Sequence, residues 1–194
     1  MDAERKRQLE QKIASGARLD RADGIALYES GDLAWLGGLA HAARVARHGD
    51  AGYFGTGEAA ELPLSYGADA GELVDELLRL RDREENAEVL VPTRATDAVT
   101  GAQTLKTYAL ARLLVDNIPH LRTSADADGE QGAKLALQHG ADELASAELP
   151  DDDLVILIRE AGFRPVQRGA HYTVVAEHPG PDASIRETPQ AMRL

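Results

Sequence analysis

The chain has 194 residues, 43% of them hydrophobic and 28% charged, so it can bury a core as one domain with a small appendage. Acidic residues outnumber basic ones by 33 to 21, and the net charge of -12 argues against nucleic acid or an anionic membrane as partner. No cysteine is present, which excludes disulfides, cysteine nucleophiles and thiolate-bound metal clusters built from this chain. The charged N-terminal stretch and the lack of a run of about 18 apolar residues predict a cytoplasmic protein.

The first fifty residues predict three helices, each preceded by an aspartate that can cap it: Asp2, Asp20 and Asp32. In the third helix, Leu36, Leu39 and Ala43 form one apolar stripe. Gly37 and Gly38 weaken this helix unless another part of the chain packs closely there. We expect residues 1–50 to form an N-terminal helical cap.

From residue 51 onward, short apolar runs alternate with amphipathic helices, after a glycine-rich stretch over 49–57 that predicts a loop. The pattern predicts strands at 62–66, 88–91 (ended by Pro92), 118–123 and 142–148, followed by a pair at 163–167 and 171–177. It predicts helices starting at 69 and spanning 104–115, 129–138 and 154–161. Such alternation is typical of βα units in a parallel sheet.

A closed eight-stranded barrel needs about 200 residues or more, and this chain uses its first fifty elsewhere. We therefore expect an α/β fold, a partial (half) barrel of about four parallel strands. The half-barrel would span residues 51–177, and a flexible C-terminal tail would follow over 178–194.

Several segments resemble a known enzyme family. Residues 12–50 are similar to the N-terminal helices of radical-SAM enzymes that make aminofutalosine, cyclise dehypoxanthine futalosine or build a deazaflavin. The blocks DNIPH (116–120) and AGFRPVQR (161–168) are the most specific parts of the resemblance. Residues 72–84, 105–122 and 134–144 are similar to further helices and strands of the family's barrel.

The departures from the family pattern bear on function. In the family, the segment matching His48–Asp50 leads closely to three cysteines that hold an iron–sulfur cluster, which presents S-adenosylmethionine. This chain continues instead with AGYFGTGEAAELPLSYG over 51–67. The resemblance thus implies that about half of the barrel is missing, together with the cluster ligands. We expect no cluster, no S-adenosylmethionine and no radical chemistry from this chain.

Four residues are candidate ligand contacts: Asn117, His120 and Arg122 near the third predicted strand, and Arg94 after the second. At the carboxyl mouth of a parallel sheet, such residues can bind anionic or nucleoside ligands. Alternatively, Asn117 only shapes a turn, and His120 is a buried, hydrogen-bonded histidine.

Two further histidines, His41 and His48, share one face of the third predicted helix. Two ligands at this spacing make a poor metal site without a third. We expect an exposed helix face there and no metal.

Three functions stay open. The first is a non-catalytic binding or regulatory protein for a nucleoside-type ligand, linked to menaquinone (futalosine) or deazaflavin metabolism. The second is a non-redox enzyme with His120 as acid or base and Arg94 or Arg122 as anion anchor. The third is an accessory subunit of a full-length family member. Because four strands would leave open edges and an apolar face, we expect a homodimer or a complex with such a relative.

Overall fold

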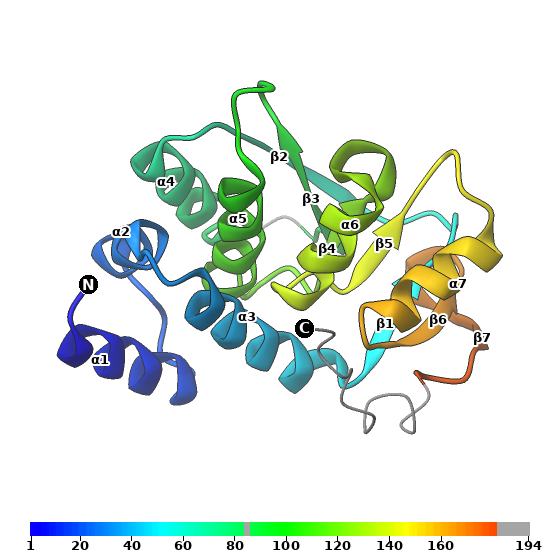
Figure 1. Ribbon diagram of the computed structural model, residues 1–194, viewed down its shortest axis with the longest axis horizontal. Helices are drawn as coiled ribbons and strands as arrows, with labels where there is room; N and C mark the ends of the chain where they lie inside the picture. The colour runs from blue at the N-terminus through cyan, green and yellow to red at the C-terminus, as the bar shows by residue number, and fades with distance from the viewer. Residues whose placement is uncertain (84–85, 182–194) are drawn as a thin grey trace, which may run out of the picture.

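The computed structural model describes residues 1–83 and 86–181 (Figure 1). Within them the chain forms seven α-helices, one short 3-10 helix (η1) and one seven-stranded sheet. The helices are α1 (Ala3–Ala14), α2 (Arg21–Glu29), α3 (Leu33–His48), α4 (Ala70–Arg81), α5 (Gly101–Leu114), α6 (Ala125–Gln138), α7 (Asp151–Glu160) and η1 (Ala170–Tyr172). The strands are β1 (Ala51–Phe54), β2 (Glu61–Tyr66), β3 (Val89–Arg94), β4 (His120–Ser124), β5 (Glu143–Ala145), β6 (Arg164–Arg168) and β7 (Val174–Glu177).

The three N-terminal helices are confirmed, and so are their caps. The side chains of Asp2, Asp20 and Asp32 accept hydrogen bonds from backbone N–H groups in the first turns of α1, α2 and α3. Helix α3 packs along α5 and touches α6. The helical cap therefore shares its core with the βα region.

The α/β class is confirmed, but the sheet differs from the predicted one. Its strand order is β2-β3-β4-β5-β1-β6-β7. The first six strands in this order run parallel, and β7 runs antiparallel to β6. The sheet is open, with β2 and β7 at its edges, and it has six parallel strands where about four were predicted. A half-barrel of four strands is therefore not confirmed.

Two strand features depend on neighbours that the sequence does not reveal. β1 lies within the stretch 49–57 that predicts a loop, and its four residues are held by pairing with β5 and β6.

Pro92 lies inside β3 and does not end it. Because the N–H groups of Val89 and Ala95 point toward β2, the N–H that Pro92 lacks would face β4, and pairing with β4 stops at Leu90.

The helices α4 to α7 lie on one face of the sheet (Figure 1), as right-handed βα crossovers in one direction require. Strand residues alternate between this face and the other. In β2, for example, Leu62, Leu64 and Tyr66 are buried in the core, whereas Glu61 and Ser65 are exposed. The main core lies between the sheet and these helices.

The opposite face of the sheet is crossed by the chain itself. β1 lies inside the sheet and β2 at its edge, and both run in the same direction, so residues 55–60 must return across β5, β4 and β3. Contacts with the segment after β6 hold this connection in place. The carbonyl of Glu58 accepts the N–H of His171 at 2.7 Å, and a Cβ on Gly57 would lie 2.1 Å from the backbone of Gly169. Residues 55–60 and 169–173 thus cover this face, which we call the covered face.

Among the described residues, no helix is long and apolar enough to cross a membrane. Residues 182–194, the greater part of the predicted tail, lie outside the described residues.

Candidate functional site

Ionisable side chains converge on the covered face, near the amino ends of β4 and β5. Strand alternation sends Leu121 into the core and turns His120 and Arg122 toward the covered face. Asp142, directly before β5, and Glu143, the first residue of β5, are both fully buried. Each of the two acids is the centre of a charged group.

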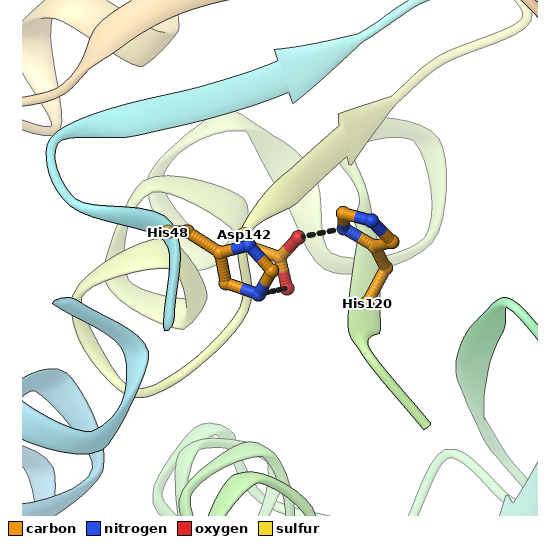
Figure 2. A group of neighbouring side chains, drawn as sticks. All are labelled: His48, His120 and Asp142. Carbon is orange, nitrogen blue, oxygen red and sulfur yellow. Dashed lines mark hydrogen bonds and ion pairs between the residues drawn. The ribbon is translucent and has the colours of Figure 1, made fainter. Parts of the chain in front are cut away.

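The first group surrounds Asp142 (Figure 2). Its Oδ1 accepts the backbone N–H of Leu121 at 2.8 Å and a hydrogen bond from Nη2 of Arg112. Its Oδ2 lies 2.6 Å from Nδ1 of His120, and its Oδ1 lies 3.6 Å from Nε2 of His48. One carboxylate thereby ties together α3, α5, β4 and β5.

Burial and charge set the protonation states in this group. Burial raises the pKa of Asp142, but the charge of Arg112 and the hydrogen bond with His120 outweigh it, and the pKa falls to about 2. Burial lowers the pKa of His48 to about 4. At neutral pH Asp142 is an anion and His48 is uncharged. Because a carbonyl oxygen only accepts, Nε2 of His48 carries the proton that it donates to Pro119 at 3.0 Å.

Two imidazoles and a carboxylate are also a donor set that zinc or non-haem iron uses, and the ligand atoms of His48, His120 and Asp142 lie within 4.8 Å of one another. The surroundings do not fit an ion. Arg112 already neutralises the carboxylate, so a divalent ion would be placed beside a buried guanidinium. The nitrogens that face Asp142 and Pro119 hold the protons of those hydrogen bonds. The group is satisfied as a hydrogen-bonded network.

Tyr172 closes this group toward solvent. Its ring lies parallel to the ring of His120, with centroids 3.4 Å apart, and His120 in turn stacks on His48 at 4.9 Å. His171 and Tyr172 have φ angles of 51° and 56°, a left-handed conformation that costs a residue with a side chain about 1 kcal/mol. The stacking, and a hydrogen bond from the Tyr172 hydroxyl to Glu143, offset this strain.

The second group surrounds Glu143. Its carboxylate accepts hydrogen bonds from Nε of Arg168 at 2.8 Å and from Tyr172, and it lies 3.0 Å from Nε of Arg122. Arg122 also bonds Glu61 on β2. Burial would lower the pKa of Arg122, but Glu143 and Glu61 together raise it above its ordinary value. The charge of Arg122 is therefore compensated by two carboxylates.

The structure separates the four residues predicted to contact a ligand. Asn117 donates its amide to a carbonyl at the end of α4, at 3.2 Å, and so shapes the turn before β4. His120 begins β4 at the amino end of the sheet, and not at the carboxyl mouth where ligand binding was predicted. Arg94 ends β3 at the opposite end and bonds the carbonyl of Ala127. Arg122 lies between the amino end of the sheet, where His120 is, and the carboxyl end, where Arg94 is. Ligand binding by the four residues stays a prediction.

The roles of His48, Asp142 and Tyr172 do not follow from the local sequence pattern. The helical spacing predicts an exposed helix face for His48, but only 8% of this side chain is exposed, because the end of α3 reaches the sheet. For Asp142 one signal was available, since two adjacent acids opening a short apolar strand are unusual and call for buried partners. No local pattern places Tyr172, since its partner His120 is far away in the sequence.

Comparisons with known proteins agree with the resemblance found in the sequence. No protein-family model matches the chain. It is 26% identical to aminodeoxyfutalosine synthase of Streptomyces coelicolor, over 387 aligned positions that take in 100% of both chains. It is 24% identical to cyclic dehypoxanthine futalosine synthase of Halalkalibacterium halodurans over 179 residues, which are 79% of this chain and 46% of that protein. The protein of the same name from Streptomyces coelicolor is 31% identical over 91 residues, 40% of this chain and 23% of that one.

The fold and the site define an α/β protein of consecutive βα units in which one face of the sheet is closed by the chain's own ionic network. In sequence the chain is a shortened relative of the aminodeoxyfutalosine synthase and cyclic dehypoxanthine futalosine synthase family, and it has no cysteine. Because it has 194 residues, gaps make up about half of its 387-position alignment.

Proposed function

We propose that the chain is a binding or regulatory protein for a nucleoside-type small molecule, linked to futalosine and menaquinone metabolism. The relatives are named for the synthesis of futalosine compounds, which supports the link. Without cysteine, the chain cannot supply thiolate ligands to an iron–sulfur cluster. A binding role without radical chemistry is consistent with both observations.

One observation carries the non-catalytic part of this proposal: most side chains of the covered face form ion pairs, hydrogen bonds or ring contacts with one another, although two buried nitrogens of Arg122 make no hydrogen bond within the described residues. In βα barrels the catalytic residues come from the strand ends and the loops at the open carboxyl mouth. Here Tyr172 lies on His120, and Glu143 holds Arg168 and lies against Arg122. Turnover within the sheet would have to break these contacts first.

The test is a titration of the full chain with aminodeoxyfutalosine and with cyclic dehypoxanthine futalosine, followed by calorimetry. The same mixtures are then incubated and separated by chromatography. We expect saturable binding and unchanged ligand. Conversion of either compound would overturn the non-catalytic role, and the absence of binding to both would overturn the binding role.

A non-redox enzyme is the second candidate, favoured by the hydrogen bond of 2.6 Å between His120 and Asp142. A carboxylate that orients an imidazole is the usual arrangement for general acid–base catalysis. Arg94 or Arg122 would then anchor an anionic substrate. If a substrate is converted, His120→Ala should abolish turnover while thermal unfolding stays cooperative; retained turnover would exclude this role for His120.

We also propose that the chain pairs in the cytoplasm, as a homodimer or with a full-length relative. The edge strand β7 supports this, because Val174 and Val175 are 57% and 64% exposed. Light scattering should give twice the mass of one chain, and co-purification with a cysteine-bearing relative would favour the mixed complex. A monodisperse monomer that captures no such relative would contradict both.

A further inference from the structure

A cavity of about 540 Å³ lies between α3 and the carboxyl ends of α6 and α7, outside both charged groups. Its walls include Gly38, His41 and Val45 of α3, His139 after α6, and Phe163 after α7. The volume falls within the range of small-molecule sites, about 300–1,000 Å³. None of the four residues predicted to contact a ligand lines this cavity.

Two adjacent glycines of α3 meet this region in different ways. A Cβ on Gly37 would lie 2.6 Å from the ring of His139, so the packing of α6 against α3 explains that glycine. A Cβ on Gly38 would have no atom within 4 Å. Glycine inside a helix costs about 1 kcal/mol relative to alanine, and no contact within the described part of the chain accounts for that cost at Gly38. A bare backbone on a cavity wall lets a ligand approach closely.

His41 supplies a polar group that no other described group of the protein bonds. Its ring contacts Phe163, with centroids 5.8 Å apart, and its nitrogens have no hydrogen-bond partner among the described residues. Burial, and secondly the charge of Arg44, lower the pKa of His41. At neutral pH the ring is therefore uncharged and offers one donor and one acceptor.

The charges around the cavity oppose one another. No lysine or arginine is among its lining residues, and the carboxylate of Asp50 is paired with Arg164 at 3.2 Å. The carboxyl ends of α6 and α7 bring partial negative charge, while the guanidinium of Arg44 lies behind Phe163, 3.7 Å from the ring centroid. Because these opposite charges offset one another, the cavity favours neither an anionic nor a cationic ligand. The exposed Val45, with 41% of its surface accessible, adds an apolar wall.

We propose that this cavity binds an uncharged aromatic ring that carries a hydroxyl group. The ring lies against Gly38 and Val45, and the hydroxyl bonds the free imidazole nitrogen of His41. The inference does not rest on the proposed function. The cavity lies among helices, away from the covered face of the sheet, and a hydroxylated aromatic ring is not specific to nucleoside-type molecules.

The test uses 4-methylphenol as the probe, with the full chain labelled for NMR detection of histidine rings. Its charged analogues, 4-methylbenzoate and 4-methylbenzylammonium, are the matched controls. For a ligand of this size we expect a Kd on the order of 1 mM for the phenol, with the His41 ring signals shifting in proportion to saturation. Both ions should bind at least about tenfold more weakly.

Two variants locate the site. Gly38→Leu fills the cavity and should weaken phenol binding at least about tenfold, whereas Gly101→Leu should leave it unchanged. Gly101 is the matched control, because it begins α5 and a Cβ there also meets nothing within 4 Å. His41→Leu removes one hydrogen bond and should weaken binding about fivefold; it tests the same site if Gly38→Leu fails to unfold cooperatively. Unchanged affinity in these variants, unmoved His41 signals, or equal binding of the ions would overturn the proposal.

Discussion

The ring of Tyr172 lies flat on the ring of His120, with centroids 3.4 Å apart and planes within 1° of parallel. The contact joins η1, after β6, to the first residue of β4. Since the hydroxyl of Tyr172 also bonds the buried Glu143, one side chain connects both charged groups of the covered face. Tyr172 therefore holds this face closed, although its backbone is strained.

Replacing Tyr172 should reveal the two contacts separately. Tyr172→Phe keeps the stacking and removes a hydrogen bond to a carboxylate, so we expect a loss of about 1.5–3 kcal/mol in the free energy of unfolding. Tyr172→Leu also loses the ring pair, about 1 kcal/mol more. Urea unfolding measures both. A Phe variant as stable as the native chain would mean that the Glu143 bond contributes nothing.

Asp142→Asn should be among the most damaging single changes. It leaves the guanidinium of Arg112 buried without its counter-charge, and breaking a buried pair in this way costs about 3–5 kcal/mol. Asp116→Asn is the matched control, because Asp116 pairs with Arg18 at the surface. That exposed pair is worth about 1 kcal/mol or less. Equal losses in the two variants, measured by urea unfolding, would contradict the central role of Asp142.

Stability should fall as the pH drops from about 6.5 toward 4. The pKa of His48 is about 4 in the folded chain and about 6.5 when unfolded, so the unfolded chain takes up a proton first and is favoured. The contribution of neutral His48 is complete above pH 6.5. Asp142, with a pKa of about 2, adds a further loss only as the pH falls below about 3.8.

The measurement is urea unfolding at several pH values between 7.5 and 4.5, compared with His48→Gln. The difference between the two chains should shrink on acidification, because only the native one loses the His48 contribution. His171→Gln is the control. His171 is exposed, and Glu88 raises its pKa, so its own contribution to stability is lost only as the pH rises above about 6.5. Below that pH this variant should keep the acid slope of the native chain. A constant difference between His48→Gln and the native chain would refute the assignment.

Alanine at the two glycines of α3 should have opposite effects. Gly38→Ala meets no atom and should stabilise the chain by about 0.5–1 kcal/mol. Gly37→Ala places a methyl group 2.6 Å from the ring of His139, which is held by a hydrogen bond to Leu135, and should destabilise it. Thermal unfolding of the two variants shows whether each substitution raises or lowers the stability. Changes in the same direction would contradict this packing.

Zinc should not stabilise the protein. Arg112 already pairs with the Asp142 carboxylate. Nε2 of His48 and Nδ1 of His120 carry the protons of their hydrogen bonds to Pro119 and Asp142. We expect the same Tm in excess zinc chloride and in chelator. A rise in Tm with zinc that disappears in His48→Ala would show that His48, His120 and Asp142 do bind the ion.

Much of the scaffold could be predicted from local patterns. The capping aspartates, the apolar stripe of α3 and the strand–helix alternation after residue 60 all follow from contacts between residues close in the sequence. Absence of cysteine and similarity to the futalosine enzymes are also properties of the sequence alone. β1 has no such signal, because its four residues form a strand only between β5 and β6.

The site was beyond prediction for a related reason. Which acid is buried, and with which base, depends on desolvation and on partners from distant segments. Asp142, His48 and Tyr172 come from different segments of the chain, and each of them contacts His120. The sequence by itself determined the helices, most of the strands and the absence of thiolate ligands. Tertiary structure alone decided which face is closed and where a cavity stays open, because strand pairing and ion pairing join residues that no local periodicity connects.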